Sequence, residues 1–278
     1  MTGQPPVALT IAGSDSGAGA GIQADIKTMG ALGAFAVTAV TAVTAQNTAA
    51  VEGVHVLPSE FVRQQIATVL ADLPVAATKT GMLADVDIIA VVGQCAGSGD
   101  LPKLVVDPVM VSSSGQPLLG DGGVSAYRDL LVPFALVVTP NLWEAALLCD
   151  ADPAGLTGVD AMADAARTIH ALGPGWVLVK GGHLAGVEPG GDARTLPSVP
   201  DVLYDGTTVS VLQADRVDTP NSHGTGCSLS AAIAAKLAAG ADVPAAVTEA
   251  KAFVHRALVG GVAWRLGKGH GPLDHFGR

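Results

Sequence analysis

The chain has 278 residues, which is enough for one large α/β domain or two small ones, and 49% of them are hydrophobic. With 15 Lys and Arg against 25 Asp and Glu, the net charge is −10, which argues against a nucleic-acid partner. The N-terminal residues carry no basic segment, and no apolar run reaches ~18 residues without a polar break, so neither a signal peptide nor a membrane span is expected.

The three cysteines stand far apart, at Cys95, Cys149 and Cys227, and none belongs to a CxxC pair. Such an odd, scattered set argues against a disulfide framework and against a zinc site. The seven histidines show no metal-ligand spacing either. We therefore expect a cytoplasmic protein whose thiols stay reduced.

Short apolar runs alternate with segments of helical periodicity along the whole chain. In the first half, we expect strands at residues 7–11, 34–45, 51–56, 76–80 and 104–106, and helices at 21–32, 61–73 and 85–93. In the second half, we expect strands at 136–138, 176–179, 202–204 and 209–213, and helices at 143–149, 162–173, 227–239 and 244–266. The last two strands form a predicted hairpin around Asp205-Gly206. This alternation predicts an α/β fold with a mostly parallel sheet and helices on both faces.

No shift in composition divides the chain, so we expect one domain over residues 1–278. The one low-complexity stretch, residues 182–200, is rich in Gly and Pro. We predict that it is a mobile flap near a nucleotide, and the alternative is an inert surface insertion.

Polar residues follow the predicted strands at the point where each strand ends. In open α/β sheets, ligands bind beyond these carboxyl ends. The arrangement predicts a binding site, although polar loops alone would give the same pattern. The polar positions are Gly13-Ser14-Asp15, Lys79-Thr80-Gly81, Asp107, Asn141 and Lys180.

The most informative segment is residues 218–227, which precedes an Ala-rich predicted helix. Gly224 and Gly226 allow a tight turn that exposes backbone N–H groups at the helix N-terminus, where the macrodipole favours anions. With Thr225 they would stabilise charge on a phosphoryl group in transfer. Cys227 would lie at the helix start, where we expect a lowered thiol pKa and a role as proton acceptor. The alternative is a glycine loop that caps a helix beside a small buried Cys.

Of two common nucleotide-binding patterns, one is absent and the other is incomplete. No Lys-Ser or Lys-Thr follows the glycines of residues 218–227, so the loop is not a Walker A motif. Near the N-terminus, Ile22 stands where the third glycine of GxGxxG belongs, which weakens a dinucleotide-binding interpretation.

Three further positions have both a chemical and a structural interpretation. Glu144 near a helix start could hold hydrated Mg²⁺, but the pair Asn141 and Glu144 is by itself better explained as a helix-capping box. Asp107 could bind Mg²⁺ through water, or it could simply begin a turn before Pro108. Lys180 at the end of a buried strand favours a phosphate partner, or its side chain reaches the surface.

Several motifs together resemble the hydroxymethylpyrimidine/phosphomethylpyrimidine kinases, in family order and over nearly the whole chain. The matching segments are residues 11–25, 40–48, 79–83, 106–110, 139–141 with Glu144, 179–183, 223–227 and 269–273. The resemblance implies a ribokinase-like three-layer fold. It also implies two ATP-dependent phosphorylations in thiamin diphosphate synthesis. The first acts on the hydroxymethyl group of 4-amino-5-hydroxymethyl-2-methylpyrimidine, and the second converts the monophosphate to the diphosphate.

The resemblance also assigns roles to particular residues. Asp25, Gln46, Met82 and Val109 would surround the pyrimidine, and Gly13 would line its pocket. Gln46 is the strongest of these assignments, because an amide can meet a ring nitrogen and an amino group together. Lys180, Asn141, Thr225 and Glu144 would handle ATP and Mg²⁺, and Gly224, Thr225 and Gly226 would form the anion hole. A homodimer is implied as well, with the strand at residues 51–56 helping the contact.

The sequence departs from the family at a few positions. Residues 112–114 are serines where many relatives have a Lys, and Ser222 replaces the usual Thr. Cys227 stands where sugar kinases of the superfamily have an Asp base, which argues against a sugar substrate. The nearest alternative is a pyridoxal or pyridoxine kinase. A non-catalytic pyrimidine-binding regulatory protein and a dinucleotide oxidoreductase remain as alternatives of other classes.

Overall fold

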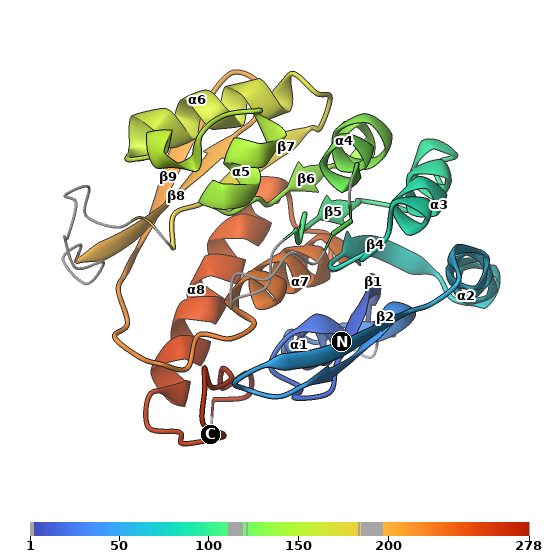
Figure 1. Cartoon of the computed structure of the whole chain (residues 1–278), viewed down its shortest axis with the longest axis horizontal. Coiled ribbons are helices and arrows are strands. Elements are labelled where there is room, and N and C mark those ends of the chain that lie inside the picture. Colours follow the sequence, from blue (N-terminus) through green and yellow to red (C-terminus); the bar gives the residue numbers. More distant parts are fainter. Residues whose placement is uncertain (1–2, 111–118, 121, 183, 185–196, 278) are drawn as a thin grey trace.

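The computed structural model describes residues 3–110, 119–120, 122–182, 184 and 197–277 (Figure 1). Its centre is a nine-stranded sheet in the order β3-β2-β1-β4-β5-β6-β7-β8-β9. The strands are β1 Val7–Asp15, β2 Phe35–Gln46, β3 Val51–Val56, β4 Val75–Thr80, β5 Val105–Val106, β6 Val137–Val138, β7 Trp176–Lys180, β8 Ser198–Tyr204 and β9 Val209–Asp215.

The middle of the sheet is parallel and its two margins are not. β1 pairs in parallel with β2 and β4, and β5, β6 and β7 continue in the same direction. β3 runs antiparallel to β2, and β8 and β9 form an antiparallel hairpin beside β7. The central strands are buried on both faces, which explains why their sequences are continuous apolar runs.

Two layers of helices cover the sheet (Figure 1). One apolar layer is formed by α1, α7 and α8, which pack against Ala8, Ala77, Val105 and Val137 of the sheet. The other layer is formed by α2 to α6, which pack against the opposite side chains of the same strands. The helices are α1 Gly21–Ala31, α2 Ser59–Asp72, α3 Val86–Gly97, α4 Gly123–Ala126, α5 Leu142–Leu148, α6 Val159–His170, α7 Thr225–Ala238 and α8 Val243–Gly261.

The structure confirms the predicted α/β fold, with differences at the ends of elements. α8 ends at Gly261 and not at residue 266, because the side chain of Asn221 donates to the carbonyls of Gly261 and Trp264 and closes the helix end. α4 had no predicted counterpart. No described helix is long and apolar enough to cross a membrane.

The predicted loop at residues 182–200 is shorter than expected, because Ser198–Tyr204 is strand β8 and pairs with β7. Residues 183 and 185–196 lie outside the described residues, as do the serines at 112–114.

The apolar layers contain buried hydroxyl groups on β4. Thr78 and Thr80 are fully buried, and neither side-chain oxygen has a hydrogen-bond partner among the described residues. A hydroxyl buried in this way costs stability.

Candidate active site

The parallel strands place their carboxyl ends at one edge of the sheet, and the N-terminus of α7 faces that edge. α7 begins at Thr225, directly after Gly224, whose φ of 87° is a conformation that other residues rarely adopt. A side chain at Gly224 would also collide with the carbonyl oxygen of Gly19. No described side chain caps this helix, and its first turn has no acidic residue. The N–H groups of Gly226 and Cys227 have no partner within the helix, so this end can receive an anion.

Lys180 brings a positive charge to the same place. A Cβ atom at Gly226 would lie 3.3 Å from Lys180 Nζ, so the ammonium is packed against the start of α7. The ammonium is also 2.8 Å from Asp107 Oδ1 and 3.9 Å from Glu144 Oε2. Burial alone would lower the pKa of Lys180, but the charges of Asp107 and Glu144 outweigh burial and raise it. Lys180 therefore carries its full charge at neutral pH.

Asp107 holds this lysine in position. Besides the ammonium of Lys180, it accepts hydrogen bonds from Thr139 Oγ1 at 3.3 Å and from Ser230 Oγ at 3.2 Å. Burial alone would raise the pKa of Asp107, but Lys180 and Lys79 more than reverse that effect and lower it. Since Ser230 lies on α7 and Lys180 on β7, the Asp107 carboxylate joins α7 to the sheet.

Asn141 and Glu144 form the capping box that their spacing predicts. The Asn141 side chain accepts from the Glu144 N–H at 3.0 Å, and Glu144 Oε2 accepts from the Asn141 N–H at 2.7 Å. Burial raises the pKa of Glu144 to about 7, in spite of the opposing charge of Lys180. The cap therefore places a carboxyl that titrates near neutral pH beside Lys180.

Cys227 lies between the starts of two helices. It is the third residue of α7, and the Gly21 N–H at the start of α1 donates toward its sulfur. The expected lowering of its pKa is wrong. Burial raises the pKa of Cys227 to about 11, and the nearby ammonium of Lys79 offsets only part of that rise. The thiol is therefore protonated at neutral pH.

Asp25 lies deeper than the other residues assigned to the pyrimidine. Its side chain has no exposed surface, and it accepts from Lys79 Nζ at 2.8 Å and from Thr10 Oγ1 at 2.6 Å. Lys79 is equally buried. A direct contact between Asp25 and a ring would require this ion pair to open.

The remaining predicted pyrimidine residues come from the ends of β1, β2, β4 and β5. Gly13 and Met82 are in contact: the Gly13 N–H donates to the Met82 carbonyl at 3.1 Å, and a Cβ at Gly13 would lie 2.5 Å from Met82 Cε. The Gln46 amide lies 3.3 Å from the His223 ring and 3.2 Å from Thr44 Oγ1. Val109 follows β5 and is partly exposed.

Sequence reasoning missed the pair formed by Asp15 and His223. His223 Nε2 lies 3.0 Å from Asp15 Oδ2, and the same carboxylate accepts the N–H groups of Gly17, Gly19 and Ala20. Burial alone would raise the pKa of Asp15, but His223 and these amides outweigh it and lower the pKa. A short-range signal existed, because an Asp two residues before a Gly is typical of an Asx-turn.

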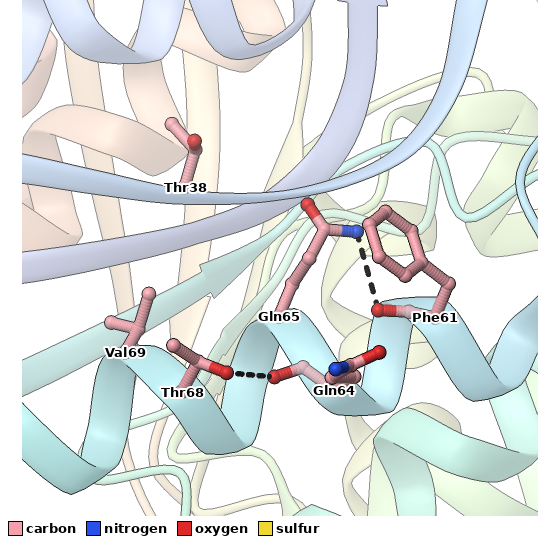
Figure 2. Close-up of a pocket in the computed structure, with 6 residues that line it drawn as sticks. All are labelled: Thr38, Phe61, Gln64, Gln65, Thr68 and Val69. Atoms are coloured by element: carbon pink, nitrogen blue, oxygen red, sulfur yellow. Dashed lines mark hydrogen bonds between the residues drawn. The ribbon is translucent and has the colours of Figure 1, made fainter.

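Two hollows lie in the described structure, and the first lies away from this edge. One of about 270 Å³ lies between Thr38 of β2 and the Phe61, Gln64, Gln65, Thr68 and Val69 side chains of α2 (Figure 2). The hydrogen bonds drawn there stay within α2, and Gln65 also bonds to the backbone N–H and carbonyl of Val40. This hollow thus lies between β2 and α2 and contains none of the predicted site residues.

No group of three or more His, Cys, Asp or Glu in the described part of the chain is arranged to hold a metal ion. Asp107 and Glu144 are two carboxylates beside one lysine. A divalent cation there would need further oxygen ligands from water or phosphate.

Comparison with known proteins agrees with this geometry. Residues 15–274 match the phosphomethylpyrimidine kinase family. A hydroxymethylpyrimidine/phosphomethylpyrimidine kinase of Streptomyces coelicolor is 46% identical, over 98% of this chain and 94% of the relative. A chloroplastic thiamine biosynthetic bifunctional enzyme of Arabidopsis thaliana is 45% identical over 98% of this chain, which spans only 50% of that protein.

Among solved structures, the pyridoxal kinase from Staphylococcus aureus in complex with ADP superimposes with a TM-score of 0.87 at 36% identity. The match covers 99% of this chain and 95% of that one. A match of this extent, together with the nine-stranded sheet between two helix layers, establishes the ribokinase-like fold. The chain belongs to the phosphomethylpyrimidine kinase family.

Proposed function

We propose that residues 1–278 act as one kinase domain that phosphorylates 4-amino-5-hydroxymethyl-2-methylpyrimidine, and then its monophosphate, with ATP in thiamin diphosphate synthesis. The observation that carries this proposal is the packing of the Lys180 ammonium against Gly226 at an uncapped helix N-terminus. The names of the full-length relatives support the substrate.

The phosphates of ATP bind where positive charge meets backbone amides at the start of α7. The N–H of Gly226 has no partner within the helix, whereas that of Thr225 donates to the Ser222 carbonyl at 3.3 Å and would turn to the phosphate. Lys180 and the amides of Gly224, Thr225 and Gly226 receive the phosphoryl group in transfer, and this charge stabilisation supplies most of the rate enhancement. Asn141, whose side chain caps α5, lies beside Lys180 across an isolated β-bridge and orients the nucleotide.

The pyrimidine lies at the ends of β1, β2 and β4, against Gly13, Gln46 and Met82. The Gln46 amide donates to a ring nitrogen and accepts from the amino group. Val109 contacts one side of the ring. Asp25 lies beneath the pocket, where its buried ion pair with Lys79 supports the pocket floor. This placement directs the hydroxymethyl oxygen toward the start of α7.

Cys227 accepts the proton of that hydroxyl as the oxygen bonds to phosphorus and ADP leaves. Only a thiolate can accept a proton, and the pKa of about 11 keeps most of the thiol protonated at neutral pH. The fraction of active enzyme therefore grows as pH rises.

Magnesium fits this edge of the sheet as a hydrated ion shared with the phosphates. Glu144 and Asp107 would hold it, and the buried carboxylate oxygens are the hard donors that Mg²⁺ prefers. Asp107 already has three hydrogen-bond donors, so it would contact the ion through water. When bound, the ion neutralises charge on the phosphates.

A pyridoxal kinase is the second candidate. The Staphylococcus aureus structure that superimposes with a TM-score of 0.87 belongs to an enzyme of that name. A purely regulatory pyrimidine-binding protein has less support, because binding alone needs no lysine packed against an anion-binding helix end.

The deciding experiment measures ADP release with Mg-ATP and, in parallel, hydroxymethylpyrimidine, its monophosphate, pyridoxal and ribose. We expect turnover on both pyrimidines. Turnover on pyridoxal alone would retain the phosphoryl chemistry and overturn both the substrate and the role of Gln46.

We further propose that the chain forms a homodimer through the ribbon of β2 and β3. Val43, Val54 and Val56 are large apolar side chains on this ribbon, and they are 46%, 44% and 37% exposed. The same ribbon borders a second hollow of about 390 Å³. Sedimentation at micromolar concentration should give the dimer mass, and a monomer alone would rule the proposal out. We place the protein in the cytoplasm, where its three free cysteines stay reduced.

A further inference from the structure

The segment after α8 contains a glycine at every second position, Gly267, Gly269 and Gly271, and the proposed chemistry uses none of them. Each is in tight contact with another part of the chain. A Cβ at Gly267 or Gly269 would collide with Thr48, and one at Gly271 would collide with the Asn221 side chain. We call residues 267–275 the bracing segment.

One end of the bracing segment holds the turn that follows Gln46. Thr48 Oγ1 accepts hydrogen bonds from the backbone N–H groups of Lys268 at 3.1 Å and Gly269 at 3.2 Å. Thr48 lies only two residues beyond Gln46, the residue proposed to bind the pyrimidine. The bracing segment therefore fixes the position of the pyrimidine side of the site.

The middle of the bracing segment holds the loop before α7. The His223 N–H donates to the Gly271 carbonyl at 3.1 Å, and His223 and Pro272 form a parallel β-bridge. Asn221, which is 3% exposed, packs against Gly271 and donates to the carbonyls at the end of α8. Because no described side chain caps α7, the loop takes its shape from such contacts and from Gly224.

The far end of the bracing segment reaches the helix itself. His275 Nε2 lies 2.9 Å from Ser228 Oγ, both side chains are buried, and Ser228 is the residue after Cys227. Burial lowers the pKa of His275 to about 4, so the ring is neutral at physiological pH and the contact does not depend on a charge. Three attachment points thus connect the bracing segment to the two halves of the proposed site.

We propose that the bracing segment is a positioning element that sets the distance between the pyrimidine-binding turn at Thr48 and the anion-binding loop at Asn221 to Gly224. It touches neither substrate, and it aligns the hydroxymethyl oxygen with the phosphoryl group. Positional errors of about 1 Å at a reacting centre can cost about 10²-fold in rate. This inference rests on the proposed function.

The test compares Thr48→Val with Thr48→Ser, since only the serine keeps the hydroxyl that both N–H groups reach. For Thr48→Val we expect kcat on the pyrimidine to fall about tenfold, because two hydrogen bonds are lost. The KM for ATP should stay within about twofold, and more ADP should form than phosphorylated pyrimidine. Thr48→Ser should restore kcat and the equal formation of ADP and phosphorylated pyrimidine. Equal kcat in both variants and the wild type would overturn the proposal.

Alanine variants of two glycines, Gly269 and Gly155, test the positioning role independently. Gly269→Ala drives a methyl group into the Thr48 backbone and should lower kcat at least as strongly as Thr48→Val. Gly155→Ala is the matched control, because nothing lies within 4 Å of its Cβ position. If both alanine variants behave alike, the bracing segment has no positioning role.

Amide hydrogen exchange separates this inference from the proposed function, because it needs no turnover. Thr48→Val should accelerate exchange at the hydrogen-bonded amides of His223 and Thr225 about tenfold while the central strands stay protected. If the wild type is active on pyridoxal alone, the same kinetic comparison is made with pyridoxal. If the wild type turns over no substrate, the function fails, and unchanged exchange in the variant would still refute the bracing role.

Discussion

Lys180 Nζ lies 2.8 Å from Asp107 Oδ1, and the two side chains are 12% and 2% exposed. The pair joins the end of β7 to the residue that follows β5, at the point where α7 begins. A largely buried lysine needs a fixed counter-charge, and Asp107 supplies it.

Replacing Lys180 with Met should remove both the phosphate contact and the partner of Asp107. We expect kcat to fall about 10²–10³-fold and the free energy of unfolding to fall by about 3 kcal/mol, because Asp107 stays buried without its ion pair. Steady-state kinetics and urea unfolding measure the two effects.

The double variant Lys180→Met, Asp107→Asn separates the effect on turnover from the effect on stability. Removing both charges should recover much of the stability and none of the turnover. Recovery of turnover would mean that Lys180 serves only as a structural partner of Asp107.

Cys227 leads to a prediction about pH. With a thiol pKa of about 11, the thiolate fraction rises with each pH unit from 7 to about 10, so kcat/KM should rise over the same range. Cys227→Ala should lower kcat about 10²-fold or more while substrate binding survives. A pH-independent rate, or full turnover in the alanine variant, would remove Cys227 from the mechanism.

Glu144 should make stability depend on pH in the ligand-free protein. Its pKa is raised from 4.5 to about 7, so the folded state keeps a proton that the unfolded state has already released between these values. The stabilisation is complete below about pH 4.5 and is lost as pH rises to about 7, by up to about 3 kcal/mol. Unfolding curves of the wild type and Glu144→Gln should diverge over this range, and parallel curves would contradict the raised pKa.

The unpartnered hydroxyl of Thr80 should be dispensable. Thr80→Val replaces a buried oxygen that has no partner among the described residues with a methyl group of similar size, and should leave stability equal or higher by about 1 kcal/mol. Thr41→Val is the control, because Thr41 Oγ1 donates to the Met82 carbonyl at 2.7 Å and its loss should cost about 1 kcal/mol. Similar losses in both variants would indicate an internal water at Thr80.

Features set by local pattern were predictable from the sequence. The continuous apolar runs indicated buried parallel strands, and the polar residue after each run marked the edge that Lys180, Asp107 and Asn141 share. The glycines at 224 and 226 identified the start of α7 to within two residues. Each of these signals lies within about ten residues of chain.

Features that depend on distant contacts were not predictable. Asp15 and His223 are 208 residues apart, and no periodicity connects them. Cys227 is half-buried, and the desolvation of its thiol between α1 and α7 outweighs the helix-end effect that the sequence suggested. Asp25 fits the family motif, but its full burial against Lys79 appears only in three dimensions.

The start of α7, where Gly224 provides no side-chain cap, has a consequence for thermal stability. A side-chain cap at this position would contribute about 1 kcal/mol to stability. Without one, the N–H groups at this helix end remain available to an anion. Any anion that fits there stabilises the native state by mass action. The melting temperature of the ligand-free protein should therefore rise with added pyrophosphate, which makes thermal unfolding a simple gauge of occupancy at this site.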